Sequence, residues 1–249
     1  MGWFAKRIMA AANPVLAPFG CRVVPSWARV VPESMLEANP LIGSSPRFEF
    51  GGQSFPYFVH HHNCGWPPPV ATERTVELAI ADYWLNQVPL NEIIEVGAVT
   101  PYYWPGRVSR VVDPADPSPF VTERRLVSEV DLTGASVLSI STYEHIGQEE
   151  YGMPAKPLLL EAAINQLLTQ AKRFLVTVPI GYNAHMDKIV FSSRMLDDVS
   201  MSFVVRHEDG ASWSEVSDPE SARQKYGRLG ANTVCVFERG GLVLRDHPK

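Results

Sequence analysis

Cysteine is scarce in this sequence: Cys21, Cys64 and Cys235 stand far apart in a chain of 249 residues. No two of them form a CxxC pair, so the spacing predicts neither a disulfide framework nor a structural zinc site. Unpaired thiols are typical of proteins in a reducing compartment. We therefore expect a cytoplasmic protein with no bound metal.

Long hydrophobic runs are also missing. The stretch of residues 1–20 is interrupted by Asn13, Pro14 and Pro18 well before it reaches membrane-spanning length. We expect neither a transmembrane helix nor a signal peptide. The favoured interpretation of this stretch is a helix packed on its own domain, and the alternative is weak attachment to a membrane surface through its apolar face.

Positive charge is not in excess. The 22 Lys and Arg residues are outnumbered by 27 Asp and Glu residues, which gives a net charge of -5. Proteins that bind nucleic acid usually carry an extended basic face, so this balance argues against nucleic acid as a partner. The hydrophobic fraction of 45% is ordinary for a folded α/β protein of this length.

The dinucleotide-binding fingerprint GxGxxG does not occur in the sequence. A pyrophosphate needs that close glycine backbone and the start of a helix behind it. The absence of the fingerprint therefore disfavours NAD and FAD, and it favours a cofactor without a pyrophosphate.

Residues 1–71 are rich in proline and aromatic side chains and show no sustained periodicity beyond a first helix. They predict an N-terminal extension that caps the substrate, because they are too short and irregular for an independent domain. Within this extension, Gly51-Gly52 separates β-like runs at 47–50 and 55–59, which predicts a hairpin.

Residues 72–249 alternate between apolar runs and helical segments, as an α/β domain does. Thr72 is a candidate N-cap for a helix that ends before Pro89, and the apolar spacing over 158–173 predicts a crossover helix. The last two strands are expected to pair antiparallel, because glycine and proline break up their connection. Buried strands are predicted at 93–97, 111–113, 136–141, 174–179, 202–206 and 233–238.

Acidic residues and a glycine accompany the ends of the first two predicted strands. Glu95 and Gly97 belong to the first, and Asp113 ends the second. In an open α/β sheet, ligands bind beyond the carboxyl ends of the strands, and an acidic side chain there is suited to the hydroxyls of a ribose. A turn-capping role for Asp113 is the structural alternative.

The motifs IIEVG, VVDP, SEVDLTG, VLSISTYEHIG and FLVTVPIGYN follow one another between residues 93 and 183. This succession resembles the motifs of class I, Rossmann-like S-adenosylmethionine-dependent methyltransferases, especially methyltransferase-like proteins of surface-polysaccharide biosynthesis. The resemblance covers roughly residues 72–239, and SISTYEHIG with TVPIGYN is its most specific part. It implies a mostly parallel seven-stranded sheet with an antiparallel closing strand.

The resemblance also implies roles for individual residues. Glu95 and Gly97, with Ala98 in the same loop, would line the methionine moiety, and Asp113 would bind the ribose hydroxyls. Asp131, after a short third strand, would face the adenine amino group. Ser141 and Thr142 would border the cofactor after the fourth strand, and Glu144 and His145 would stand beside the methyl donor.

The glycine loop departs from the pattern of that family, because Val99 and Pro101 stand where further glycines are usual. Tyr102, Tyr103 and Trp104 follow. These aromatics are candidates for packing against the sulfonium cation or closing over the acceptor, and filling space beside a shortened helix is the alternative.

Acceptor-side candidates come from two places. Tyr57, His60 and His62 belong to the segment from Phe48 to Trp66, which we expect to form one wall of the acceptor pocket. A metal site in the histidine run is disfavoured, because no second spaced pair of ligands accompanies it. Further candidates, after the fifth of these strands, are Tyr182 and Asn183.

The preferred function is methyl transfer from S-adenosylmethionine to an oxygen or nitrogen of a small-molecule or sugar acceptor. His145 is the candidate base, and Glu144 its acidic neighbour, with metal ligation and capping of the next helix as their alternatives. A methyltransferase-like protein that only binds or scaffolds is the second hypothesis. Another nucleotide-dependent enzyme of the same fold is the third.

Overall fold

The computed structural model describes most of the chain after residue 46. The described residues are 47–58, 72–150, 153–192, 194–196, 199–210, 212–227 and 230–240, with Ala11, Ala12, Val15 and the backbone of 21–24 and 29–32. The backbone of β1 (Cys21–Val24) and β2 (Arg29–Pro32) forms a separate antiparallel pair. No helix among the described residues is long and apolar enough to cross a membrane.

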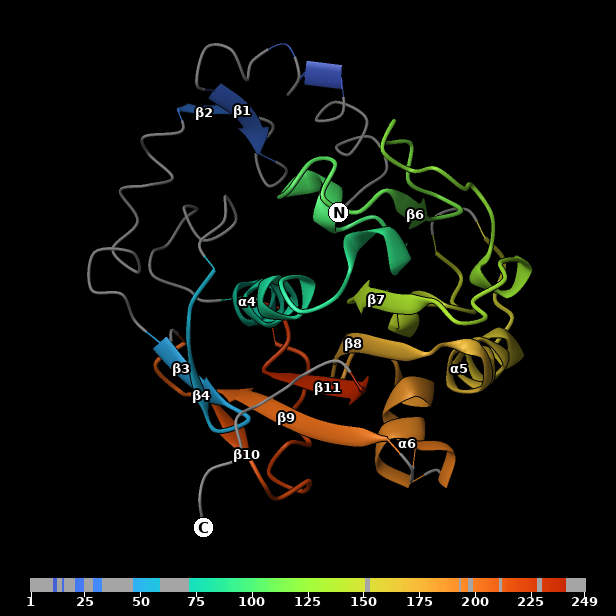
Figure 1. The fold of residues 1–249 in the computed structure, drawn as a ribbon. Helices are drawn as coiled ribbons and strands as arrows, with labels where there is room; N and C mark the ends of the chain where they lie inside the picture. Colours follow the sequence, from blue (N-terminus) through green and yellow to red (C-terminus); the bar gives the residue numbers. More distant parts are fainter. Residues whose placement is uncertain are drawn as a thin grey trace.

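A seven-stranded mixed sheet forms the centre of an α/β fold (Figure 1). Its strand order is β10-β9-β11-β8-β7-β5-β6. Neighbours are parallel from β6 through β5 and β7 to β8, whereas β11 runs antiparallel to β8 and β9, and β10 antiparallel to β9. The strands are β5 (Ile93–Val96), β6 (Arg110–Val112), β7 (Ser136–Ile140), β8 (Arg173–Pro179), β9 (Ser200–Arg206), β10 (Trp213–Val216) and β11 (Thr233–Arg239).

Helices cover both faces of this sheet (Figure 1). Side chains alternate between the faces because successive residues of a strand point in opposite directions. On β8, Leu175 joins the core beneath α4 (Glu73–Leu85), whereas Phe174 and Val176 join the core beneath α5 (Leu158–Gln170) and α6 (Ala184–Ser192). The short 3₁₀ helices are η2 (Leu90–Glu92), η3 (Thr100–Tyr102), η4 (Val127–Glu129), η5 (Tyr143–His145) and η6 (Arg194–Leu196).

The structure bears out the six predicted strands and the two helices predicted within residues 72–249 to within a few residues, and it corrects four details. The helix expected in residues 1–20 lies largely outside the described residues. The expected short third strand is absent from the described residues, where η4 and an isolated bridge from Val112 to Glu123 stand instead. The seventh strand is β10, at the opposite edge. Because β11 lies between β8 and β9, the antiparallel part is broader than one closing strand. Thr72 holds the N-cap position with an extended backbone, but its side chain makes no capping hydrogen bond.

The predicted hairpin is present as β3 (Arg47–Phe50) and β4 (Gln53–Pro56). Gly51 and Gly52 both have positive φ, at 56° and 70°, which is the backbone that a tight hairpin turn requires. Phe48 and Phe55 stack at 5.5 Å between ring centroids and share a core with α4. The hairpin is therefore part of the packed domain, beside α4 and β10 (Figure 1).

Candidate functional site

A cavity of about 370 Å³ lies at the carboxyl ends of the parallel strands. Its walls come from the loops after β5, β6, β7 and β8 and from the first turn of α4. Its position follows from the topology: β5 pairs with β6 on one side and β7 on the other, so the connections leave it in opposite directions. Such a switch point leaves a crevice beyond the strand ends.

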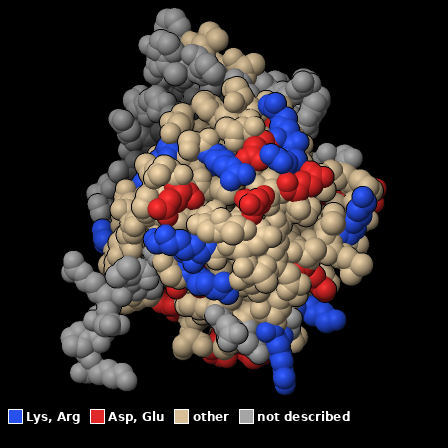
Figure 2. Space-filling model, turned by 45° about the vertical axis from the view of Figure 1, so that its right-hand side comes forward, with Lys and Arg blue, Asp and Glu red and all other residues tan. Residues whose placement is uncertain are grey.

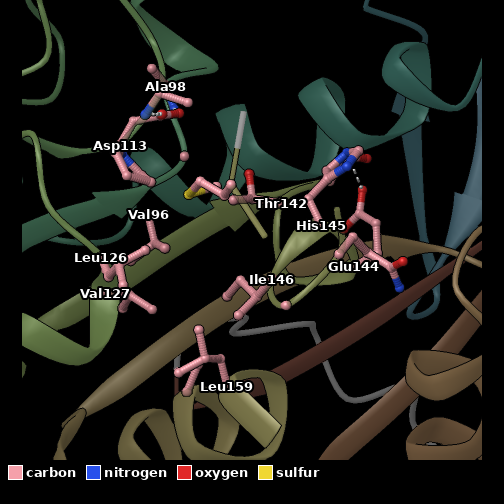
Figure 3. Close-up of a pocket in the computed structure, with 18 of the residues that line it drawn as sticks. Val96, Ala98, Asp113, Leu126, Val127, Thr142, Glu144, His145, Ile146 and Leu159 are labelled. Carbon is pink, nitrogen blue, oxygen red and sulfur yellow. Dashed lines mark hydrogen bonds and ion pairs between the residues drawn. The ribbon is translucent and has the colours of Figure 1, made fainter. Parts of the chain in front are cut away.

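One end of the cavity is formed by the loop after β5 and the end of β6. Gly97 has φ +88°, and a Cβ on it would lie 1.9 Å from the Thr142 Oγ1 atom. Only glycine fits this contact, which brings the backbone of the β5 loop against the loop after β7. Figure 3 shows Ala98 and Asp113 together at this end, with Leu126 and Val127 nearby.

Asp113 is fixed by three backbone donors. Its Oδ2 accepts a hydrogen bond from the Ala98 amide at 3.0 Å, and its Oδ1 accepts from the amides of Ala115 and Asp116 at 2.8 and 2.7 Å. The carboxylate caps the turn that follows β6 and lines the cavity as well. The ligand-binding and turn-capping interpretations are therefore compatible, since Oδ2 accepts only one of these hydrogen bonds and has a further lone pair.

Glu95 lies behind the loop and is not among the residues that line the cavity. Its carboxylate accepts hydrogen bonds from the amides of Val99 and Thr100 at 3.0 and 2.7 Å and from the Thr100 hydroxyl. Burial raises the pKa of Glu95 to about 7. Glu95 therefore stabilises the loop after β5 through these hydrogen bonds. It does not line the cavity, which corrects the prediction that it lines the methionine moiety.

The loop after β7 supplies the middle of the cavity and its other end. Ser141 is the one non-glycine residue with positive φ among those described, at 43°, a sparsely populated backbone found often at functional sites. Its hydroxyl donates to the Glu77 Oε1 atom at 2.5 Å. Both Ser141 and Thr142 line the cavity, as expected.

Glu144 and His145 come next and point toward one another (Figure 3). Glu144 is 1% exposed, its Oε2 has no hydrogen-bond partner, and burial raises its pKa well above the ordinary value. His145 stands between two carboxylates, with Nε2 at 3.5 Å from the Glu144 Oε1 and Nδ1 at 2.5 Å from the Glu150 Oε2. Each ring nitrogen of His145 therefore faces a carboxylate.

The loop after β8 completes this end. Tyr182 lines the cavity, donates to the Glu150 Oε1 at 2.6 Å and lies edge-on to the His145 ring at 4.8 Å. Asn183 is buried, and its amide nitrogen donates to the Glu144 carbonyl at 2.6 Å while its Oδ1 accepts from the His185 amide. Asn183 does not line the cavity, so its role here is to fix the Glu144 backbone and the start of α6.

Among the lining residues that the sequence analysis missed are Glu73 and Arg74 in the first turn of α4, and Tyr226. Arg74 forms an ion pair with the buried Glu77 at 3.2 Å. No local pattern marks these positions as cavity residues, because only the packing of α4 across the sheet places them there.

Other candidates lie elsewhere. Asp131 is exposed in the turn that precedes β7, whereas the cavity lies at the opposite end of that strand, which corrects the prediction that it faces adenine. Tyr102 donates to Asp116, and Tyr103 packs edge-on against Phe58, so neither lines the cavity.

The predicted wall from Phe48 to Trp66 is not formed by its described part, residues 48–58, none of which lines the cavity. Tyr57 is 7% exposed, and its hydroxyl accepts from the Trp213 amide at 2.8 Å, so it belongs to the core. His60 and His62 lie outside the described residues.

Charge and metal chemistry add two observations. On the face drawn in Figure 2, acidic and basic side chains of the described residues are interspersed. The described residues contain no cluster of three or more His, Cys, Asp or Glu side chains arranged to hold a metal ion.

Comparison of the chain with family models, curated proteins and solved structures finds no match.

Proposed function

We propose that this chain binds S-adenosylmethionine and transfers its methyl group to an oxygen or nitrogen of a small-molecule or sugar acceptor. The observation that carries the proposal is the meeting of Gly97, Asp113 and Thr142 in one cavity at the switch point of the sheet. These residues belong to three different motifs of the sequence resemblance and come together only in the fold.

The strand arrangement supports the proposal. From β6 through β5, β7 and β8, the parallel strands follow the order second, first, third and fourth along the chain, an order that agrees with a doubly wound sheet whose switch point lies beside the first strand. The cavity volume of about 370 Å³ also falls in the range of about 300–1,000 Å³ that small-molecule sites occupy.

The residues at the Gly97 end fit a nucleoside. Asp113 Oδ2 has one lone pair left to accept a hydrogen bond from a ribose hydroxyl, and the apolar side chains of Val96, Leu126 and Val127 suit a flat base. Gly97 has no side chain, so backbone lies directly against the cavity. No second glycine is needed for this contact, which weakens the motive for a purely scaffolding protein.

S-adenosylmethionine supplies an electrophilic methyl group on a sulfonium when it is bound. The protein has to hold the acceptor in line with that group, because proximity and orientation provide much of the acceleration. For a hydroxyl acceptor, His145 is positioned to take the proton, with Glu144 and Glu150 stabilising the imidazolium that results. We place this activity in the cytoplasm, in the synthesis of surface polysaccharide.

The test is calorimetric titration with S-adenosylmethionine, S-adenosylhomocysteine and NAD. We expect the first two to bind and NAD not to bind. Asp113→Ala should weaken the affinity tenfold or more, because charged hydrogen bonds are worth about 1.5–3 kcal/mol. Asp131→Ala is the matched control, since it removes an exposed aspartate outside the cavity.

Asp113 also caps a turn, so Asp113→Asn is titrated beside Asp113→Ala, with thermal unfolding of each variant. Undiminished affinity in a folded Asp113→Ala protein would remove Asp113 from the site. Binding of NAD without either sulfur compound would favour the hypothesis of another nucleotide-dependent enzyme.

A further inference from the structure

The end of the cavity away from Asp113 carries an excess of buried negative charge. Glu77 is fully buried, and its Oε1 accepts hydrogen bonds from Ser141 and Thr177 at 2.5 and 2.8 Å. The guanidinium of Arg74 lies 3.2 Å from the other oxygen of Glu77. Arg74 and Glu77 therefore balance one another, and Glu73 and Glu144 remain as the carboxylates that line this end.

Both remaining carboxylates have an oxygen without a partner. Glu144 is 1% exposed, and its Oε2 accepts no hydrogen bond; the buried Oε2 of Glu73 accepts none either. A buried carboxylate without a partner is costly, so it either takes up a proton or is compensated by a ligand. Burial raises the pKa of Glu73 to about 7 and raises the pKa of Glu144 well above its ordinary value.

Aromatic rings stand at the mouth of the same end. Tyr182 and Tyr226 are 36% and 39% exposed, although both are large side chains, and their rings lie 5.4 Å apart. Both line the cavity. Aromatic faces attract cations, and carboxylates beneath such faces complete a site for a positively charged group.

We propose that this acidic end, formed by Glu73 and Glu144 below Tyr182 and Tyr226, binds an ammonium group carried by the acceptor molecule. The two carboxylate oxygens without partners would accept its N–H donors, and the tyrosine rings would cover its apolar side. The assignment of this ligand as the acceptor rests on the proposed function, whereas the binding of the ammonium does not.

Pairs of compounds that differ in the amine alone provide the probe. Glucosamine is compared with N-acetylglucosamine and glucose, and ethanolamine with ethylene glycol, by saturation-transfer NMR on the full chain, with and without S-adenosylhomocysteine. We expect each amine to bind at least tenfold more tightly than its neutral counterparts. Equal binding within both pairs overturns the proposal.

Glu144→Gln and Glu73→Gln keep the side-chain shape and remove the charge. Each should reduce the preference for the amine at least fivefold. Glu149→Gln is the matched control, because Glu149 is exposed in the same loop as Glu144 and does not line the cavity. An unchanged preference in both cavity variants, or an equal loss in Glu149→Gln, contradicts the proposal.

The pH dependence is a second readout. Binding of ethanolamine, which keeps its positive charge up to pH 8, should strengthen as pH rises through about 7, where Glu73 ionises, and should release protons to the buffer. The charged groups that face this carboxylate pair are Glu77 and Arg74 from α4, Arg206 from β9, and His145 with Glu150 from the loop after β7. Binding that does not change between pH 6 and 8 in Glu73→Gln, but strengthens in the original protein, assigns the effect to Glu73.

The outcomes separate the two proposals. If amines bind selectively and S-adenosylmethionine does not, the proposed function fails and the ammonium site stands. If the two glutamine variants lose affinity for S-adenosylmethionine instead of for the amines, the carboxylates serve the cofactor's own ammonium, and the inference about the acceptor is overturned.

Discussion

Two strand ends meet at the contact between Gly97 and Thr142, and a buried glutamate accompanies each. Near the end of β5, Glu95 is 0% exposed and accepts three hydrogen bonds from the residues of the loop that follows it. In the loop after β7, Glu144 is 1% exposed and leaves Oε2 without a partner. Burial raises the pKa of both side chains.

The difference shows that burial and a shifted pKa do not identify a binding residue by themselves. Glu95 uses its oxygens to fix the backbone, so it stabilises a loop and has little left for a ligand. The Oε2 atom of Glu144 accepts no hydrogen bond from the described residues, and because Glu144 lines the cavity, this atom is accessible to a ligand. Satisfaction of the hydrogen-bonding groups separates structural from functional carboxylates here.

The largest effect is expected where the two loops touch. Gly97→Ala adds a Cβ 1.9 Å from Thr142 and forces an L side chain to φ +88°. We expect a loss of about 3 kcal/mol in the free energy of unfolding, measured by denaturant titration, with loss of cofactor binding. Either the loop after β5 or Thr142 has to move.

Gly134→Ala is the control for the backbone cost alone. Gly134 has φ +71°, and no atom lies within 4 Å of its added Cβ, so we expect about 1 kcal/mol. Equal losses for the two variants would mean that the contact between the loops does not contribute.

The next effect compares the glutamates directly. Glu95→Gln places an amide NH₂ among the donors of Val99 and Thr100, and a buried donor left without an acceptor costs about 1–3 kcal/mol. Glu144→Gln removes no such hydrogen bond, so its free energy of unfolding should equal or exceed that of the original protein. A larger loss for Glu144→Gln than for Glu95→Gln would reverse our assignment of the structural role.

The smallest effect concerns the pH dependence of stability. A carboxyl group whose pKa is raised by folding binds a proton in the folded state at pH values where the unfolded chain has lost it. The free energy of unfolding should therefore fall as pH rises from the ordinary carboxyl pKa of 4.5 through the raised values, which are about 7 for Glu73 and Glu95.

Removing the Glu144 carboxyl should flatten this decline between pH 5 and 8 in Glu144→Gln, because burial raises the pKa of Glu144 well above its ordinary value. The exposed Glu149→Gln should leave the slope as it is. A slope unchanged in Glu144→Gln would show that the carboxyl is not desolvated in the folded protein. Thermal or denaturant unfolding across that pH range provides the measurement.

Much of the sheet was predictable from the sequence. Helices cover both faces of its central strands, so these strands appear in the sequence as short runs of apolar residues. The strand expected before Asp131 was not, because that segment forms η4 instead and only one isolated bridge, from Val112 to Glu123, joins the sheet nearby. The strand β10 was missed because three of its four residues are only partly buried.

The site was predictable where the residues follow strands, as Gly97, Asp113 and Thr142 do. Glu73 and Arg74 could not be found in this way. They begin a helix whose pattern indicates only which face is buried, and their place in the cavity depends on how α4 crosses the sheet. The prediction for Tyr57 was wrong in the opposite sense. An aromatic residue in an irregular segment suggested a pocket residue, whereas Tyr57 is buried in the hydrophobic core.

The hairpin of β3 and β4 limits how far the chain can be shortened from its N-terminal side for protein production. Phe48, Phe50, Phe55 and Tyr57 are each at most 7% exposed, and they belong to the same core as α4. A shortened chain that starts at residue 72 would begin neatly at the helix, yet it would uncover a contiguous apolar surface on α4 and the sheet. Such surfaces promote self-association. The shortest form of this protein that keeps this apolar surface covered must therefore begin before Arg47.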